Sequence, residues 1–171
     1  MNIIFDINKF NIEYTHFLET KPNMILEGEF TKIIYSNPFF TLNGIYLYLP
    51  IEVQSIENQY VHKDRENREH INKNIIKFYP SSHINNPLIL ELSKIEYNII
   101  DYYKQLNNIT KKTVAILTRQ LYSGSLKVYK ETNDPTLTKN SVYIIKISGI
   151  WENESEIGIT YKIIESFPVS L

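Results

Sequence analysis

The chain has 171 residues, of which 43% are hydrophobic, and its formal net charge is −1. This length and apolar content suit a single domain over residues 1–171 with a substantial core. The absence of cysteine excludes disulfide frameworks, thiolate metal sites and cysteine nucleophiles.

The N-terminal sequence has no pattern typical of secretion. The segment MNIIFDINKF places an acid within a short apolar stretch and lacks the basic lead of a signal peptide. No apolar run approaches the length of a membrane span. We therefore expect an intracellular protein that is not secreted and does not contact a membrane.

Charge is distributed unevenly along the chain. From Tyr102 to Trp151 there are eight Lys or Arg residues and two acids, a net charge of +6, so the rest of the chain is acidic. Such asymmetry can mark a part of a protein that faces nucleic acid. Alternatively, the lysines only keep a strand-rich half of the chain soluble.

The N-terminal half has the pattern of strands separated by turns, because Ile and Tyr are abundant and both favour strands. Apolar and polar residues alternate over 10–14 and again around Gly28. A hairpin signal follows at Asn43-Gly44, a pair that suits a two-residue turn. Such a hairpin places Tyr46 and Tyr48 on one face and aliphatic side chains on the other.

Residues 54–74 are polar and charged, which predicts a long loop or a short exposed helix, and a strand is expected over 75–79. One amphipathic helix is expected at about 87–106, capped by Asn86. Its apolar residues recur at intervals of three and four along a single face, at Leu88, Leu92, Ile95, Ile99, Tyr102 and Leu106.

The segment after this helix predicts a hairpin that turns at Gly124-Ser125 and pairs Leu121 with Val128. Its polar face would carry Tyr122, Lys127 and Tyr129. A loop over 131–140 then leads into the final hairpin.

The final hairpin covers residues 141–164 and is followed by a short tail, 165–171. If Trp151 and Ile157 flank the turn, Lys146 lies opposite Lys162. The same register pairs residue 149 with residue 159 and residue 148 with residue 160, and it puts Trp151 on the apolar face, in a core or rim role. Facing lysines are unfavourable without a counter-ion, so they suggest a surface that meets an anion.

Tyrosines beside lysines have the chemistry of a single-strand binding surface, because rings stack on bases and cations neutralise phosphates. The simpler interpretation is that tyrosine is a good strand former. The candidate nucleic-acid-binding residues are Tyr46, Tyr48, Arg119, Tyr122, Lys127, Tyr129, Lys130, Lys146 and Lys162.

The closing segment YIIKISGIWENESEIGITYKII resembles the end of the OB-fold single-stranded-DNA-binding proteins of phages and large DNA viruses. The matching positions are Ile147, Gly149, Trp151, Glu152, Glu156, Gly158, Thr160, Tyr161 and Lys162. The resemblance implies a mainly β, OB-fold-like antiparallel barrel with one helix. It also implies non-catalytic, largely sequence-independent binding of single-stranded DNA in viral DNA replication or recombination, at the site of viral replication, with replication proteins as further partners.

No motif nominates catalytic residues, a cofactor or a metal site. The spacing of His62 and His70 matches no ligand pattern, and the acids at positions 152, 154 and 156 fit an exposed turn. The main alternative is a structural or virion protein whose barrel forms a protein–protein interface. RNA in place of DNA, and a homo-oligomer, are left open by the sequence.

Overall fold

The computed structural model describes residues 3–23, 27–59, 62–63, 69–70, 73–130 and 141–166. Its helices are α1 (Asn85–Asn107) and α2 (Ile116–Tyr122), with 3-10 turns η1 (Ile7–Lys9) and η2 (Ile12–Tyr14). Its strands are β1 (Thr15–Pro22), β2 (Glu29–Ser36), β3 (Thr41–Leu42), β4 (Ile45–Leu49), β5 (Ser55–Gln59), β6 (His62–Lys63), β7 (Glu69–His70), β8 (Lys73–Lys77), β9 (Lys112–Thr113), β10 (Ser125–Lys130), β11 (Val142–Glu152) and β12 (Glu156–Ser166).

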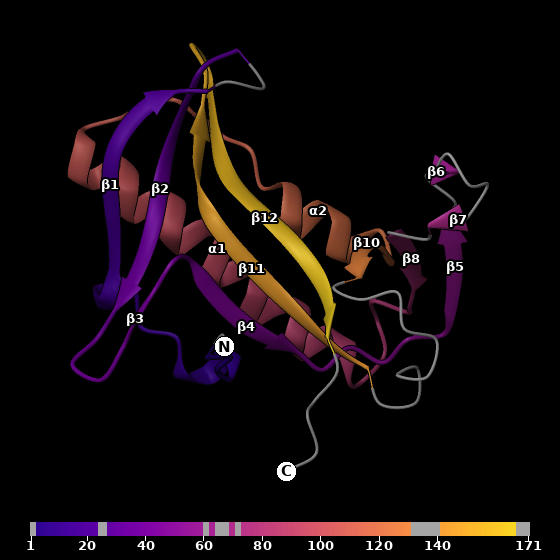
Figure 1. The fold of residues 1–171 in the computed structure, drawn as a ribbon. Helices are drawn as coiled ribbons and strands as arrows, with labels where there is room; N and C mark the ends of the chain where they lie inside the picture. Colours follow the sequence, from indigo (N-terminus) through magenta and orange to yellow (C-terminus); the bar gives the residue numbers. More distant parts are fainter. Residues whose placement is uncertain are drawn as a thin grey trace.

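Ten of the described strands form one sheet, and the fold is therefore mainly β as expected (Figure 1). The main path runs β1-β2-β11-β12-β10-β8-β5, with β3 beside β2, β4 beside β11 and β9 beside β12. The sheet is mixed, since β10 and β9 run parallel to β12. Its ends, β1 and β5, are not paired with each other in the described residues, so the sheet is open where a closed antiparallel barrel was expected.

The β11–β12 hairpin is the centre of the sheet, and a β-bulge divides it into two halves. The register from Val142 to Ile147 pairs Lys146 with Lys162, as predicted. Beyond the bulge Gly149 lies opposite Thr160 and Trp151 opposite Gly158, so the predicted register is wrong by one residue near the turn. An extra residue on one strand of a ladder reverses the faces that follow it.

The same bulge marks where the central strands change neighbours. β11 pairs with β4 before the bulge and with β2 after it. β12 pairs with β9 near its start and with β10 near its end. Gly44 lies where the chain returns to the edge of β11. Its φ is +106°, and a Cβ there would lie 2.7 Å from the Ile147 carbonyl oxygen.

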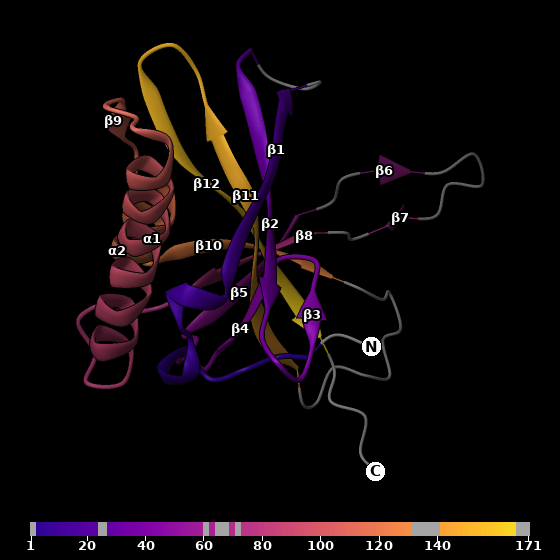
Figure 2. The same cartoon turned by 90° about the vertical axis from the view of Figure 1, so that its left-hand side faces the viewer.

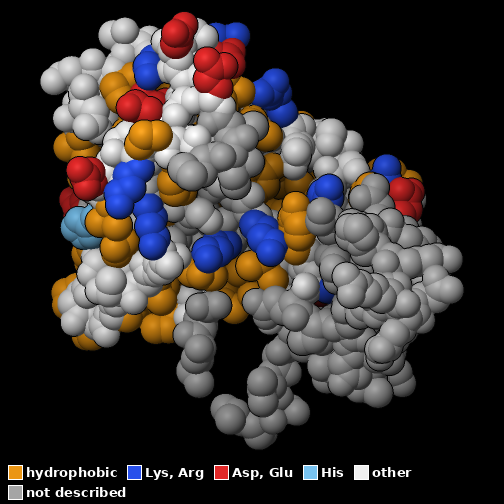
Figure 3. All heavy atoms as spheres, turned by 45° about the horizontal axis from the view of Figure 1, so that its top comes forward, with side chains coloured by type: hydrophobic (Ala, Val, Ile, Leu, Met, Phe, Trp, Pro, Cys, Tyr) orange, Lys and Arg blue, Asp and Glu red, His pale blue; other side chains and the backbone are white. Residues whose placement is uncertain are grey.

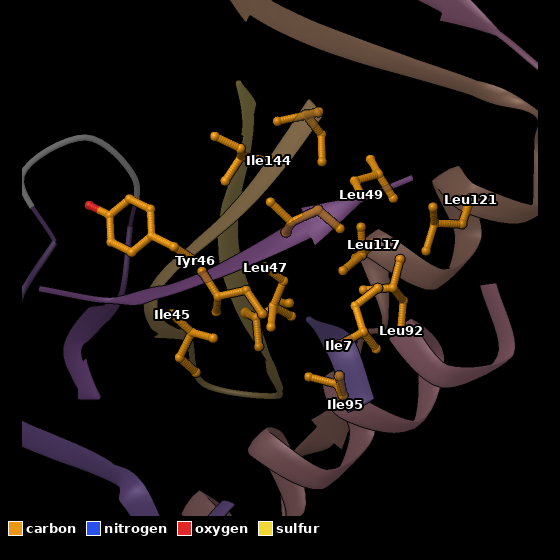
Figure 4. Packing of buried hydrophobic residues seen from close by; sticks show 14 of the residues in the cluster. Ile7, Ile45, Tyr46, Leu47, Leu49, Leu92, Ile95, Leu117, Leu121 and Ile144 are labelled. Atoms are coloured by element: carbon orange, nitrogen blue, oxygen red, sulfur yellow. The ribbon is translucent and has the colours of Figure 1, made fainter. Parts of the chain in front are cut away.

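Both helices lie on one side of the sheet (Figure 2). The hydrophobic core fills the space between the helices and the sheet. Leu47 and Leu49 project from β4 toward the helices, whereas Tyr46 projects away from them (Figure 4). The side chains that meet across this layer include Leu47, Leu92, Leu117, Leu121, Val128, Ile145 and Ile163, all at most 1% exposed.

The predicted amphipathic helix is confirmed as α1, with slightly wider bounds, but the predicted cap is wrong, because Asn86 lies within the first turn of the helix. Its start is held by Ser82, whose hydroxyl accepts from the Asn85 amide, and by the buried Asn85 side chain, which bonds to Glu52 and Tyr79. It ends at Asn108 in the left-handed region, with φ at 53°. Asparagine tolerates that conformation better than other residues that carry a side chain.

Three other predictions about local structure are wrong. Residues 116–122 form α2, and β10 pairs with β8 and β12, so the hairpin at Gly124-Ser125 does not exist. β3 and β4 pair with different strands, so Asn43-Gly44 is a bend between them and not a hairpin turn. Residues 12–14 form a 3-10 turn in place of a strand.

The prediction of a loop or short helix over residues 54–74 is also wrong, because the described residues of this segment include strands. β5 and the start of β8 pair with each other inside it, and β6 pairs with β7. At the C-terminal end, β12 continues through Ser166, so the first residues of the predicted tail are strand. The loop predicted over 131–140 lies outside the described residues.

The short helix α2 is stabilised by a carboxylate from α1. Glu96 is fully buried, and its side chain accepts from the backbone N–H groups of Leu117 and Thr118 and from the Thr118 hydroxyl. These N–H groups have no partner within the helix, and the helix dipole favours a negative charge at this end. Glu96 therefore replaces the N-cap side chain that α2 lacks.

Candidate nucleic-acid interface

The sheet has one face turned away from α1 and α2, which we call the open face. Alternation along the strands assigns residues to it, since Ile150 and Glu152 face the helices and Trp151 between them does not. Residues directly opposite on neighbouring strands share a face. The open face thus includes Phe30, Lys32, Tyr46, Lys127, Tyr129, Lys146, Trp151, Thr160 and Lys162.

Two lysines of the open face lie over tyrosine rings. The Lys162 Nζ is 4.4 Å from the centroid of the Tyr129 ring, and the Lys146 Nζ is 5.2 Å from that of Tyr46. A cation above an aromatic face gains about 0.5–1 kcal/mol at exposed sites. This gain offsets part of the cost of placing two lysines at directly opposite positions of β11 and β12 in the absence of an anion.

The lysines of the open face are not neutralised by acids. Within the described part of the chain, Lys127, Lys146 and Lys162 form no ion pair with a carboxylate, whereas Lys111 and Lys112 pair with Glu152 and Glu156. Basic side chains gather across the middle of this side of the molecule, with hydrophobic ones among them (Figure 3). The result is a surface of exposed positive charge interleaved with rings.

Trp151 belongs to this surface, in contrast to the apolar position predicted for it. The bulge turns it to the open face, where it is half-buried and lies across from Phe30 on β2. Its indole lies over Gly158, where a Cβ would come within 2.9 Å of the ring. The Phe30 ring lies in the same way over Gly149. The two glycines thus make room for two rings on the open face.

A hollow of about 280 Å³ opens among these residues. Lys127, Tyr129, Trp151, Thr160 and Lys162 line it from the open face. Gln120 of α2 also lines it and accepts a hydrogen bond from the Tyr161 hydroxyl. Burial, and secondarily the nearby Glu96 carboxylate, raise the pKa of Tyr161 above its ordinary value of 10.0, so this phenol remains a hydrogen-bond donor into alkaline solution.

The structure brings most of the predicted binding residues together. Tyr46, Lys127, Tyr129, Lys146 and Lys162 share the open face, although Tyr46 is only 6% exposed. Tyr48 projects from the same side of β4 as Tyr46 and lies at the edge of the open face. There it borders a different hollow, which α1 also lines.

Three predicted residues lie elsewhere. Arg119 and Tyr122 are on α2, on the helix side of the sheet, and Lys130 projects from β10 on the same side as the buried Val128. Sequence reasoning also missed Phe30, Lys32 and Trp151. For Trp151 the sequence did contain a signal, namely Gly149 two residues before it and Gly158 across the turn. A glycine on a neighbouring position leaves space for an aromatic ring on that face of the sheet.

The described structure has other hollows besides the one on the open face. A second hollow, of about 420 Å³, is lined by acids that include Glu27, Glu29 and Glu154, together with the Lys111–Glu152 pair. No group of three or more His, Asp or Glu residues suited to a metal occurs in the described ranges. Within the same ranges, neither helix combines the length and apolar character that crossing a bilayer requires.

Comparisons of the chain with protein-family models, with curated proteins and with solved structures found no match.

Proposed function

We propose that the protein binds single-stranded nucleic acid on its open face, without catalysis and with little sequence preference. The observation that carries this proposal is the Lys146–Lys162 pair: the two lysines occupy directly opposite positions of β11 and β12, their ammonium groups lie over tyrosine rings, and within the described residues neither has a carboxylate partner. Phosphates of a bound strand would supply the missing counter-charge. Neighbouring rings would stack on unpaired bases.

The composition of the open face supports a nucleic acid over a protein as the partner. Lysine is depleted from the centres of protein–protein interfaces because its ammonium group is costly to desolvate. Here Lys127, Lys146 and Lys162 lie at the middle of the sheet, on adjacent strands. The alternative of a structural protein that uses this face to contact other subunits is therefore less well supported.

The resemblance of the closing hairpin extends the proposal to a biological setting. OB-fold single-stranded-DNA-binding proteins of phages and large DNA viruses coat DNA during replication or recombination, and we propose the same role here. An OB-fold-like relationship belongs to this proposal as well, although the described sheet is open. DNA is the strand we expect to be preferred.

Titration of labelled oligo(dT) followed by fluorescence anisotropy tests the proposal. Affinity should fall as salt rises from about 50 to about 200 mM, with a slope of about −0.7 per phosphate contact. Contacts from three lysines would give a slope of about −2. A duplex of the same length should bind more weakly, because its bases are not available for stacking.

The single tryptophan provides an independent reading of where the strand binds. Trp151 is the only tryptophan in the chain and lies on the open face, so its fluorescence should be quenched in the same titration. Absence of binding below tens of micromolar at low salt would remove the proposal. Binding without any change in Trp151 emission would place the strand on another surface.

A further inference from the structure

The sheet has a gap beside the middle of β12. Among the described residues, β12 pairs with β9 up to Ile157 and with β10 from Ile163 onward. Between these positions it pairs only with β11. The helix α2 contacts both β12 and β10 and lies beside the gap (Figure 1). The sheet is therefore interrupted at this point, and α2 closes the interruption from the helix side.

The 280 Å³ hollow described above lies at this gap. Its rim belongs to the open face, with Lys127 and Tyr129 on one side and Trp151 on the other, and Ile116 and Gln120 of α2 line it as well. Pockets for drug-sized ligands usually measure about 300–1,000 Å³. A hollow slightly below this range suits a smaller, flat group.

The walls of the hollow have the chemistry that a nucleobase needs. Trp151 is held against Gly158, so its indole presents a fixed aromatic surface. The Gln120 side-chain oxygen is occupied by the Tyr161 hydroxyl, which leaves its amide N–H groups to donate. The Thr160 hydroxyl, half-buried on the rim, has no partner in the described residues. Both groups can bond to the polar edge of a base.

The charges at the rim fit the rest of a nucleotide. Lys127 and Lys162 lie opposite each other across the hollow's edge on β10 and β12, and both are exposed. If a base occupied the hollow, the phosphates on either side of its nucleotide would lie close to these two ammonium groups. Neutral flat ligands could use the aromatic walls, but they would make no use of the two cations.

We infer that the hollow between Trp151 and Tyr129 is a subsite for one unstacked base of the bound strand, with Lys127 and Lys162 on its flanking phosphates. This inference rests on the proposed function and goes beyond it. A strand held only by charge and open stacking would slide freely. A base seated in a gap of the sheet would instead fix one nucleotide relative to the protein.

The test compares two synthetic strands of equal length, one built entirely of abasic sites and one with a single central thymine. The abasic strand should bind weakly through its phosphates and leave Trp151 emission nearly unchanged. The single thymine should tighten binding by about 5- to 150-fold, the range for one stacked base, and should quench Trp151.

Two variants that narrow the hollow show whether the base occupies it. Ile116→Phe adds volume from α2 and Thr160→Leu adds it from β12, so both should lose the gain from thymine and keep the binding of the abasic strand. Ile84→Phe adds the same volume at a site that is 43% exposed and should retain the gain. Thermal unfolding is measured for each variant to check that it folds. If one of the two narrowed variants does not fold, the other is compared with the control.

The outcomes separate the inference from the proposed function. If oligo(dT) binds but the single thymine adds neither affinity nor quenching, the subsite is excluded and the proposed function stands. Retention of the thymine gain in both narrowed variants would also overturn the subsite. If neither oligo(dT) nor the abasic strand binds, both the subsite and the proposed function are wrong.

Discussion

Lys146 on β11 lies directly opposite Lys162 on β12, and each ammonium group lies over a tyrosine ring instead of beside a carboxylate. Like charges at directly opposite positions of two strands destabilise a sheet. The cost is about 0.2–1 kcal/mol, similar in size to the gain from a favourable cross-strand pair. Two contacts with aromatic rings offset about that amount. The pair is therefore tolerated in the free protein, and its positive charge stays available to an anion.

The Lys162→Gln variant should bind a single strand less tightly while keeping the stability of the protein. Loss of one phosphate contact should reduce the magnitude of the salt slope by about 0.7. The free energy of unfolding should change by less than about 1 kcal/mol, because relief of repulsion and loss of the Tyr129 contact oppose each other. Lys94→Gln, on the exposed side of α1 beside Glu91, is the matched control. Equal slopes for the two variants would show that Lys162 does not contact the strand.

The Gly158→Ala variant should displace Trp151 and destabilise the protein. A Cβ at this position would lie 2.7 Å from the Val114 carbonyl oxygen and 2.9 Å from the indole. Overpacking of this kind costs about 1–3 kcal/mol. Urea unfolding should show the loss, with a shift of Trp151 emission in the native state. Ser155→Ala, in the exposed turn of the same hairpin, should change stability by less than about 0.5 kcal/mol. A Gly158→Ala protein with unchanged emission would contradict the placement of the ring.

Replacement of Glu96 should destabilise the protein through α2. Glu96→Ala removes the acceptor for two backbone N–H groups and the Thr118 hydroxyl. We expect a loss of about 3 kcal/mol, since each buried donor left without a partner costs about 1–3 kcal/mol. Glu96→Gln should lose less, because one oxygen remains as an acceptor. Glu91→Gln, half-buried on the same helix, is the control for removal of a charge. Equal stability of the Glu96→Ala variant and the wild type would show that this carboxylate is not needed for α2.

Stability should decline at alkaline pH because two tyrosines, the buried Tyr143 and the half-buried Tyr161, ionise more readily in the unfolded chain. Burial, and secondarily nearby carboxylates, raise the pKa values of Tyr161 and Tyr143 above the unfolded value of 10.0. At Tyr143 a hydrogen bond with Ser141 lowers the pKa and opposes part of this rise. A raised folded pKa gives stability that is fully present below the unfolded pKa and lost as pH rises through and beyond it. The free energy of unfolding should therefore hold to about pH 9 and then fall by up to about 1.4 kcal/mol per pH unit for each such tyrosine.

Tyr161→Phe tests the origin of this alkaline decline. The variant should show a shallower fall above pH 10, because phenylalanine does not ionise. Tyr122→Phe removes a hydroxyl that is mostly in solvent, the residue being 53% exposed, and should leave the fall unchanged. Identical pH profiles for wild type and Tyr161→Phe would exclude Tyr161 as a contributor.

The closing hairpin shows how far sequence reasoning reaches. Alternation of Ile with polar residues predicted both strands and the Lys146–Lys162 pair, which the structure confirms. The β-bulge before Gly149 was not predicted, because Ser148 has no side-chain property that marks an extra residue. It arises where β11 changes its neighbour from β4 to β2, and those neighbours come from a distant part of the chain. The position of Trp151 on the open face depends on that change.

The helix α2 illustrates a different limit. Leu117 and Leu121 are four residues apart, a spacing that fits one face of a helix as well as alternate positions of a strand. The seven-residue segment is too short for local propensity to decide between the two. The buried carboxylate of Glu96 supplies the missing cap, and Glu96 lies on α1, 21 residues before Leu117. No local pattern carries that information.

The sequence by itself determined the β-rich class, the long amphipathic helix, and the alternation that separates Lys146 and Lys162 from the aliphatic residues beside them in the closing strands. These properties depend on neighbours a few positions apart, where the periods of strands and helices apply directly. Only the tertiary structure decided which strands adjoin, where the central hairpin bulges, and that Trp151 and two lysines meet at a gap closed by α2. Those relationships depend on contacts between segments distant in the chain, whose free energy no short stretch of residues records.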